Sequence, residues 1–283
     1  MPVLSGQDLL ARLQAGERFV ADGAMGTALI DLGIEPAETL SANITHQDAV
    51  RAIHTSYLEA GAQILTSNTF GQAGSADWEM AFLAGIQLAY ETADKSKYDI
   101  AVLVSMTAQT AINHGLALPM ILRRAGFWPC NLLVETCISQ NEALEATAVL
   151  THAELPLLAV TCHFSEDGLM PDRTSAEVAA LVMAGAGAHV VGANCGSYPA
   201  NYPDIACEMN AAKATTRSPL LFRPSAGLPT QKPFNSWQYP ITPEMFMPIA
   251  SRLLKAGANI VGGCCGTTPA HIAAVRQCMA YSP

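Results

Sequence analysis

The chain repeats one pattern: a short and almost wholly apolar run, then a longer segment with apolar residues every three or four positions. Uninterrupted apolar runs predict strands buried on both faces, and the longer segments predict helices that cover them. The predicted strands are residues 18–22, 62–66, 100–105, 131–135, 157–162, 188–193, 219–222 and 259–262. The clearest predicted helices are residues 45–60, 141–152, 174–186, 203–215, 242–256 and 269–279. This alternation predicts an α/β fold with a parallel sheet.

Eight such units suit a (β/α)8 TIM barrel, a fold of roughly 250 residues. An open, doubly wound sheet is the alternative. We favour the barrel because polar side chains and cysteines gather at the carboxyl ends of nearly all predicted strands, and a barrel brings those ends together at one mouth. These residues are Asp22, Asn68, Glu135, Cys162, Cys195, Ser225, Cys264 and Cys265. No low-complexity linker divides the chain, so we expect a single domain over residues 1–283.

Composition and charge narrow the class of protein. Half of the residues are hydrophobic and 14% are charged, which is typical of a globular chain with a large core. The net charge of −9 and the lack of a Lys/Arg cluster argue against nucleic-acid binding. The longest apolar stretch, residues 178–193, is interrupted by Gly185, Gly187 and His189, so we expect no membrane span. The amino terminus shows no secretory signal, and we therefore expect a cytoplasmic protein with reduced thiols.

Three cysteines lie at predicted strand ends beside glycines. Cys264 and Cys265 are adjacent in Gly-Gly-Cys-Cys-Gly, and Cys195 lies in Ala-Asn-Cys-Gly after a strand with the same layout. A free cysteine often serves only as a small buried hydrophobic residue, and we interpret the five other cysteines in this way. Packing does not ask for a vicinal pair between glycines, whereas three thiolates suit Zn²⁺, which binds sulfur tetrahedrally and leaves one position open in catalytic sites. We predict a zinc site of Cys195, Cys264 and Cys265.

Such a site favours one kind of chemistry. A free thiol is mostly protonated at neutral pH, whereas the thiolate is the nucleophile, and binding to zinc removes the proton. Three cysteine ligands leave an excess of negative charge, which keeps a fourth thiolate from the substrate electron-rich. We therefore expect alkyl transfer to a substrate thiol, with the three cysteines as catalytic metal ligands.

Other strand ends offer contacts for the rest of the substrate. The turn Asp22-Gly-Ala-Met-Gly-Thr27 can bring backbone N–H groups close to a carboxylate, although an ordinary turn is the alternative. Asn68 and Thr69 follow the second strand and supply amide and hydroxyl groups. Glu135 ends an apolar run, and a buried carboxylate needs a partner, for which a substrate ammonium is natural. The candidate substrate-binding residues are Asp22, Gly23, Ala24, Met25, Asn68, Thr69, Glu135 and Ser225.

These motifs together resemble the homocysteine S-methyltransferase family, which includes betaine–homocysteine methyltransferase and the N-terminal domain of cobalamin-dependent methionine synthase. The matching segments are residues 22–27, 66–70, 135–136, 192–195 and 262–271, in the family's order. The resemblance implies a (β/α)8 barrel in which Cys195, Cys264 and Cys265 hold zinc. It also implies that Asp22, Gly23, Ala24 and Glu135 contact homocysteine, which is methylated to methionine.

Two departures concern the methyl donor. Ser225 stands where the family often has asparagine, and the segment of residues 104–129 is short where the family has a long insert. A small sulfonium or quaternary amine is one possible donor. Another is methylcobalamin carried by a separate corrinoid protein, since a short loop leaves the mouth open to a bulky partner. A barrel that binds zinc or an amino acid as a sensor, without catalysis, is the alternative outside enzymes.

Overall fold

The computed structural model describes residues 3–71, 77–196, 198–231 and 237–280, and its centre is a parallel eight-stranded sheet. The strands lie in the order β1-β10-β7-β6-β5-β4-β3-β2. They are β1 (Phe19–Val20), β2 (Ile64–Thr66), β3 (Ala101–Thr107), β4 (Asn131–Cys137), β5 (Leu157–Cys162), β6 (Val190–Cys195), β7 (Leu220–Pro224) and β10 (Ile260–Val261). Every pairing in this sheet is parallel, as the apolar runs predict.

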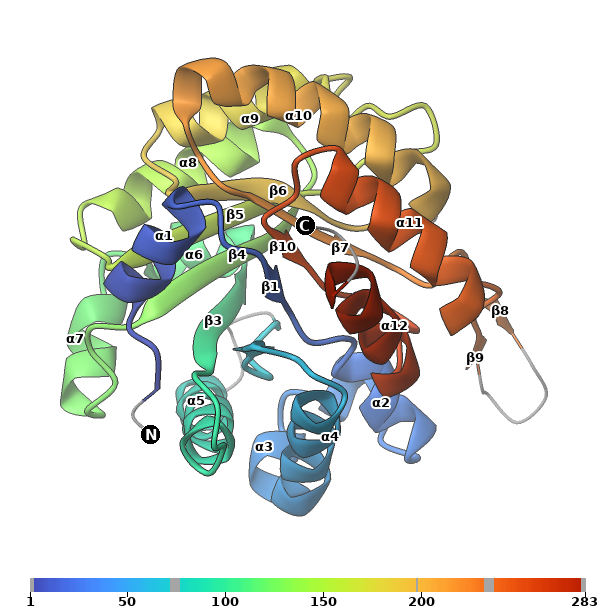
Figure 1. Ribbon diagram of the computed structural model, residues 1–283. Coiled ribbons are helices and arrows are strands. Elements are labelled where there is room, and N and C mark those ends of the chain that lie inside the picture. The colour runs from blue at the N-terminus through green and yellow to red at the C-terminus, as the bar shows by residue number, and fades with distance from the viewer. Residues whose placement is uncertain (1–2, 72–76, 197, 232–236, 281–283) are drawn as a thin grey trace.

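The sheet closes on itself between its first and second strands. A parallel bridge joins Ala21 to Ile64, the Asp22 N–H donates to the Ile64 carbonyl at 2.9 Å, and the Gln63 N–H donates to the Val20 carbonyl at 2.8 Å. The strands therefore form a nearly closed barrel with helices around it, and Figure 1 looks into this ring. This confirms the predicted TIM barrel and rejects the open sheet.

Twelve helices lie in the described part of the chain. They are α1 (Gly6–Gln14), α2 (Gly26–Asp31), α3 (Ala42–Thr45), α4 (Gln47–Glu59), α5 (Trp78–Asp94), α6 (Ala108–His114), α7 (Leu118–Arg124), α8 (Gln140–Thr151), α9 (Ala176–Gly185), α10 (Tyr202–Thr216), α11 (Pro243–Lys255) and α12 (Pro269–Ala280). Two short 3₁₀ turns lie at Pro36–Glu38 and Pro199–Asn201, and β8 (Thr230–Gln231) pairs antiparallel with β9 (Trp237–Gln238). None of the described helices is long and apolar enough to cross a membrane.

Local chemistry sets where many of these helices begin and end. Ser139, Ser175 and Thr242 each accept a hydrogen bond from a backbone N–H of the first turn, so α8, α9 and α11 are capped. Three Ala-Gly-Ala motifs follow α4, α9 and α11, and their glycines have φ between +98° and +108°. Only glycine adopts this backbone conformation without strain, so each motif stops a helix and leads the chain into the next strand.

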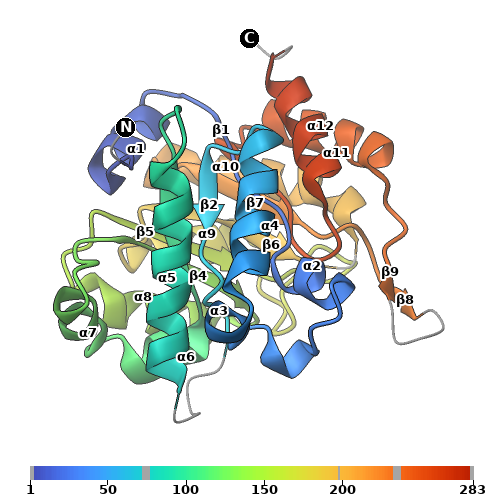
Figure 2. The ribbon, with the colours of Figure 1, turned by 90° about the horizontal axis from the view of Figure 1, so that it is seen from below.

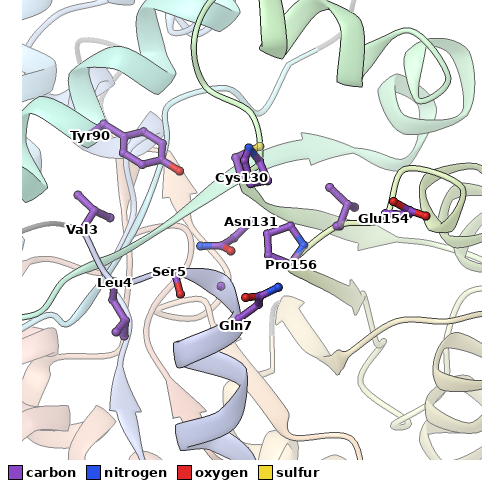
Figure 3. A pocket seen from close by; sticks show the side chains of 12 residues that line it. Val3, Leu4, Ser5, Gln7, Tyr90, Cys130, Asn131, Glu154 and Pro156 are labelled. Atoms are coloured by element: carbon purple, nitrogen blue, oxygen red, sulfur yellow. The ribbon is translucent and has the colours of Figure 1, made fainter.

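The amino-terminal end of the barrel is covered by α1. Leu9 and Leu13 on this helix are buried in one apolar cluster with Phe19, Ile64 and Leu103 from the barrel interior. Figure 2 shows α1 at one end of the barrel, opposite the loops that follow the strands. A cavity of about 380 Å³ remains beside the start of this helix (Figure 3). One wall is Asn131, whose Nδ2 donates to the Val102 carbonyl at 3.0 Å.

Candidate active site

The three predicted zinc ligands converge at the carboxyl end of the barrel. Cys195 ends β6, and Cys264 and Cys265 follow β10. Their sulfur atoms all lie within 4.8 Å of one another, and the two vicinal sulfurs are 4.0 Å apart. Cys195 has a φ of 65°, in the left-handed region, and Gly196 continues this turn. Among the described residues, no other set of three or more His, Cys, Asp or Glu side chains comes close enough to hold a metal ion.

The spacing of these sulfurs suits a tetrahedral metal. A zinc ion about 2.3 Å from each sulfur requires sulfurs about 3.8 Å apart, which is close to the observed separation of the vicinal pair. All eight cysteines are free thiols, so none of the three is lost to a disulfide. Hydrogen bonds from the Cys264 and Cys265 thiols lower the pKa of Cys195 well below its ordinary value. The donor set therefore fits zinc, with one coordination position left for a substrate.

Backbone contacts hold the cysteine loop against its neighbours. The Cys264 N–H donates to the Pro224 carbonyl at 2.9 Å, and the Ala226 N–H donates to the Cys265 carbonyl at 2.8 Å. The Thr267 hydroxyl donates to the Cys264 carbonyl at 2.7 Å and accepts from the Ala24 N–H at 3.2 Å. The loops after β1, β7 and β10 are thereby locked together, so the three cysteines are positioned before any ligand arrives.

The turn after β1 needs glycine because it lies against this loop. A Cβ on Gly23 would come 2.7 Å from a ring carbon of Tyr57 and 2.9 Å from the Thr267 hydroxyl. The Tyr57 hydroxyl itself donates to the carbonyls of Ala24 at 2.7 Å and Thr267 at 3.0 Å. A larger residue at position 23 would therefore push the turn away from the cysteines.

A cavity of about 250 Å³ opens beside the three sulfurs. Five of the predicted substrate-binding residues line it together with the cysteines: Gly23, Ala24, Met25, Asn68 and Glu135. The other three do not line it. Asp22 lies beneath the turn, Thr69 donates to the Ser105 carbonyl at 2.6 Å, and Ser225 donates to the Gly196 carbonyl. These three shape the site from behind, and Ser225 does so by bracing the turn at Cys195.

Sequence reasoning missed the charged residue at the centre of the site. Arg223, at the end of β7, forms ion pairs with Asp22 at 3.0 Å and with Glu135 at 3.1 Å. Its side chain is only 6% exposed, and it lines the cavity. Burial raises the pKa of Asp22 to about 6 and also raises the pKa of Glu135, whereas the charge of Arg223 acts in the opposite direction on both. A signal was present, because Arg223 is the lone charge in an apolar run, as Glu135 is in its own.

Asn194 is a second site residue that the sequence pattern did not indicate. Its Oδ1 accepts from the Thr136 N–H at 2.8 Å and from the Thr161 hydroxyl at 2.7 Å, and its Nδ2 lies 4.0 Å from the Cys264 sulfur. Thr136 has a φ of 64°, so the strand turns sharply just after Glu135. Asn194 thus ties the end of β4 to the cysteines and fixes the carboxylate of Glu135 relative to them.

The model of one protein family, described as homocysteine S-methyltransferase, matches residues 19–122 and 131–279. The chain belongs to the homocysteine S-methyltransferase family. The match covers all eight barrel strands, and it includes the cysteines, both carboxylates and Arg223.

Named relatives in the homocysteine S-methyltransferase family differ in length. Methionine synthase of Mycobacterium tuberculosis is 29% identical over 302 residues, which is 93% of this chain but 24% of that protein. The chain thus spans about a quarter of this relative. The S-methylmethionine–homocysteine S-methyltransferase BHMT2 of Pongo abelii is 29% identical over 294 residues, with 95% of this chain and 80% of that protein covered.

A solved structure shares the barrel of this chain. The metallated form of the homocysteine methyltransferase MmuM from Escherichia coli superimposes with a TM-score of 0.74 at 21% identity, over 94% of this chain and 98% of that one. At this identity the likeness shows the fold.

Proposed function

We propose that this chain is a zinc-dependent methyltransferase that moves a methyl group to the thiol of homocysteine and so forms methionine. Membership of the homocysteine S-methyltransferase family supports the reaction. The observation that carries the proposal is the convergence of Cys195, Cys264 and Cys265 in the lining of one cavity of about 250 Å³.

Each group around the cavity has a part in this reaction. Zinc, when bound by the three cysteines, keeps the acceptor sulfur as a thiolate at neutral pH. The cavity walls hold the acceptor so that its sulfur lies at the open side of the cysteine cluster. The acceptor sulfur then forms a bond to the methyl carbon, while the bond from that carbon to the donor breaks and its electron pair stays with the donor. The thiol proton leaves to solvent when the acceptor binds.

Asn68 and the turn of residues 23–25 are placed to position the acceptor chain. Asn68 donates to the Thr39 carbonyl at 2.8 Å and to Asn43 Oδ1 at 2.9 Å, so its orientation is fixed. The turn is fixed in the same way by Tyr57 and Thr267. A rigid wall of this kind lowers the entropy cost of bringing sulfur and methyl donor together.

A donor carried on a separate corrinoid protein is the second candidate, with the same acceptor chemistry. It is favoured by large apolar side chains that are exposed in segments following the strands, namely Phe70, Ile138, Tyr198 and Leu228. Apolar side chains exposed at this end of the barrel would suit contact with a large partner better than with a small soluble donor. We keep free S-methylmethionine and betaine as the alternatives to be compared with it.

Zinc analysis with and without homocysteine tests the proposal. One zinc per chain, and one additional sulfur ligand by X-ray absorption when homocysteine is added, is the expected result. Turnover of homocysteine with methylcobalamin, S-methylmethionine or betaine then identifies the donor. Protein purified under reducing conditions that binds no zinc would contradict the proposal and favour a sensor barrel without catalysis.

A further inference from the structure

Arg223 occupies the place between two buried carboxylates where a positive group of the substrate would be expected. Resting on the proposed function, we infer that Arg223 sets the acceptor selectivity of this site. The guanidinium takes over the pairing with Glu135 and Asp22, so the α-amino group of the acceptor adds little to binding. The acceptor class is therefore thiols of about the size of homocysteine, with or without an α-amino group.

The contacts of the two carboxylates show that few of their hydrogen-bond acceptor sites are left for a substrate. Asp22 Oδ2 accepts from the Thr66 N–H at 2.7 Å, and its Oδ1 accepts from the Thr66 hydroxyl at 2.9 Å and from Arg223 at 3.0 Å. Glu135 Oε1 accepts from the Ser105 hydroxyl, and its Oε2 accepts from Arg223 at 3.1 Å and from Asn194 at 3.5 Å. A carboxylate offers about four acceptor sites, so each has about one to spare.

The charges lead to the same conclusion. Asp22 and Glu135 together carry two negative charges when ionised, and Arg223 reduces the sum to one. An arginine keeps its proton at every accessible pH, so this positive charge is permanent. A substrate ammonium near Glu135 would therefore be attracted by one net negative charge instead of two, and the nearby guanidinium would weaken its pairing with Glu135.

The guanidinium is also held in place by the backbone. Its Nε donates to the Gly263 carbonyl at 3.1 Å, next to Cys264, and its Nη2 donates to the Gly23 carbonyl at 3.4 Å. The Arg223 side chain is only 6% exposed, and it could not turn toward solvent without breaking these hydrogen bonds. It is thus a fixed part of the wall between the carboxylates and the cysteines, and a ligand must bind beside it.

The test compares two thiols that differ in one group. L-Homocysteine and 4-sulfanylbutanoic acid share the thiol, the chain length and the carboxylate, and only the first has an amino group. Dissociation constants are measured by titration calorimetry on the zinc-loaded full chain. We expect the wild-type protein to bind the two within about threefold of each other. Arg223→Met frees both carboxylates and should favour homocysteine by at least tenfold more, as a hydrogen bond between charged groups would.

Arg223→Lys is the matched control, because it keeps the positive charge and should keep the wild-type ratio. The same ratio in wild type and Arg223→Met would overturn the inference. If Arg223→Met does not fold, the wild-type ratio still decides, since a preference for homocysteine above thirtyfold would overturn it alone. If both thiols fail to add a sulfur ligand to the zinc, the proposed methyl transfer to such thiols fails, and this inference with it.

Discussion

The two ends of the barrel are built from the same eight strands and differ in almost everything else. At the amino-terminal end, α1 packs Leu9 and Leu13 onto an interior of Phe19, Ile64 and Leu103. At the carboxyl end, the same interior gives way to three thiols and a buried network of Asp22, Glu135 and Arg223. The amino-terminal end buries apolar side chains, and the carboxyl end buries charged ones.

This difference shows where stability and chemistry come from. Apolar burial at the amino-terminal end is favourable at about 25 cal/mol per Å². Buried ion pairs, in contrast, lose much of their attraction to the cost of desolvation. The carboxyl end is therefore maintained by the rest of the barrel, and changes at the two ends should affect different measurements.

The largest expected effect comes from the thiols. Cys264→Ser removes one soft ligand, so we expect zinc to be lost and methyl transfer to fall by at least about a thousandfold while the barrel stays folded. Zinc content by elemental analysis, turnover and circular dichroism measure these three quantities. The exposed Cys207 provides the control, because Cys207→Ser should leave zinc and turnover unchanged. Full turnover by a zinc-free Cys264→Ser protein would contradict the zinc mechanism.

A change at the opposite end should do the reverse. Leu9 is fully buried, so Leu9→Ala should lower the free energy of unfolding by about 2–5 kcal/mol and leave the affinity for zinc unchanged. Urea denaturation and zinc titration give the two values. Gln14→Ala, at an exposed position of the same helix, should change neither. A weaker zinc site in Leu9→Ala would show that the two ends are coupled.

A third change concerns His54, a buried residue in the middle of the helix α4. Burial lowers the pKa of His54 to about 4, and neither ring nitrogen has a partner among the described residues. Between about pH 6.5 and pH 4 the unfolded chain binds a proton that the folded chain does not. The free energy of unfolding should therefore fall by about 2 kcal/mol from pH 7 to pH 5 through this residue.

Denaturation at both pH values, in wild type and His54→Leu, isolates this contribution. The variant should lose about 2 kcal/mol less than wild type over that range. His152→Gln, at an exposed histidine, should keep the wild-type change. An equal pH dependence in wild type and His54→Leu would show that other groups cause it.

The smallest expected effect is at the start of α1. The Ser5 hydroxyl accepts from the Asp8 N–H at 3.1 Å, so Ser5→Ala should cost about 1 kcal/mol of unfolding free energy. Ser5→Thr keeps the oxygen and should retain most of this stability. Because both changes are far from the cysteines, turnover should be the same in all three proteins, and a loss of turnover would extend the site to this end.

The sequence sufficed to predict the barrel because each strand is apolar on both faces and each glycine stop is explicit. It did not reveal α5, since the outward face of that helix carries Met80, Leu83 and Ala84 beside its polar residues, which interrupts the polar stripe in the sequence. The helices α1, α6 and α7 and the β8–β9 pair also went unpredicted, because they are short or lie outside the repeating pattern. Strand one is shorter than predicted, at two residues.

The candidate site divides in the same way. The positions of Cys195, Cys264 and Cys265 at strand ends predict that they meet, because a barrel brings the carboxyl ends of all its strands to the same end. It does not predict which way a side chain turns, so Asp22, Thr69 and Ser225 were expected in the cavity and lie behind it. The partner of Glu135 is set by a strand 88 positions later, and only the closed barrel brings Arg223 to it.

The pairing of β1 with β10 has a consequence for how the protein is made. During synthesis, β1 cannot pair with β10 until Ile260 and Val261 have been added to the chain. The vicinal cysteines emerge just after that strand, so a nascent chain that already displays Cys195 has no partner thiols for it. Any metal ion that needs all three thiols can therefore bind only after the chain has been synthesised through Cys265 and the barrel has closed.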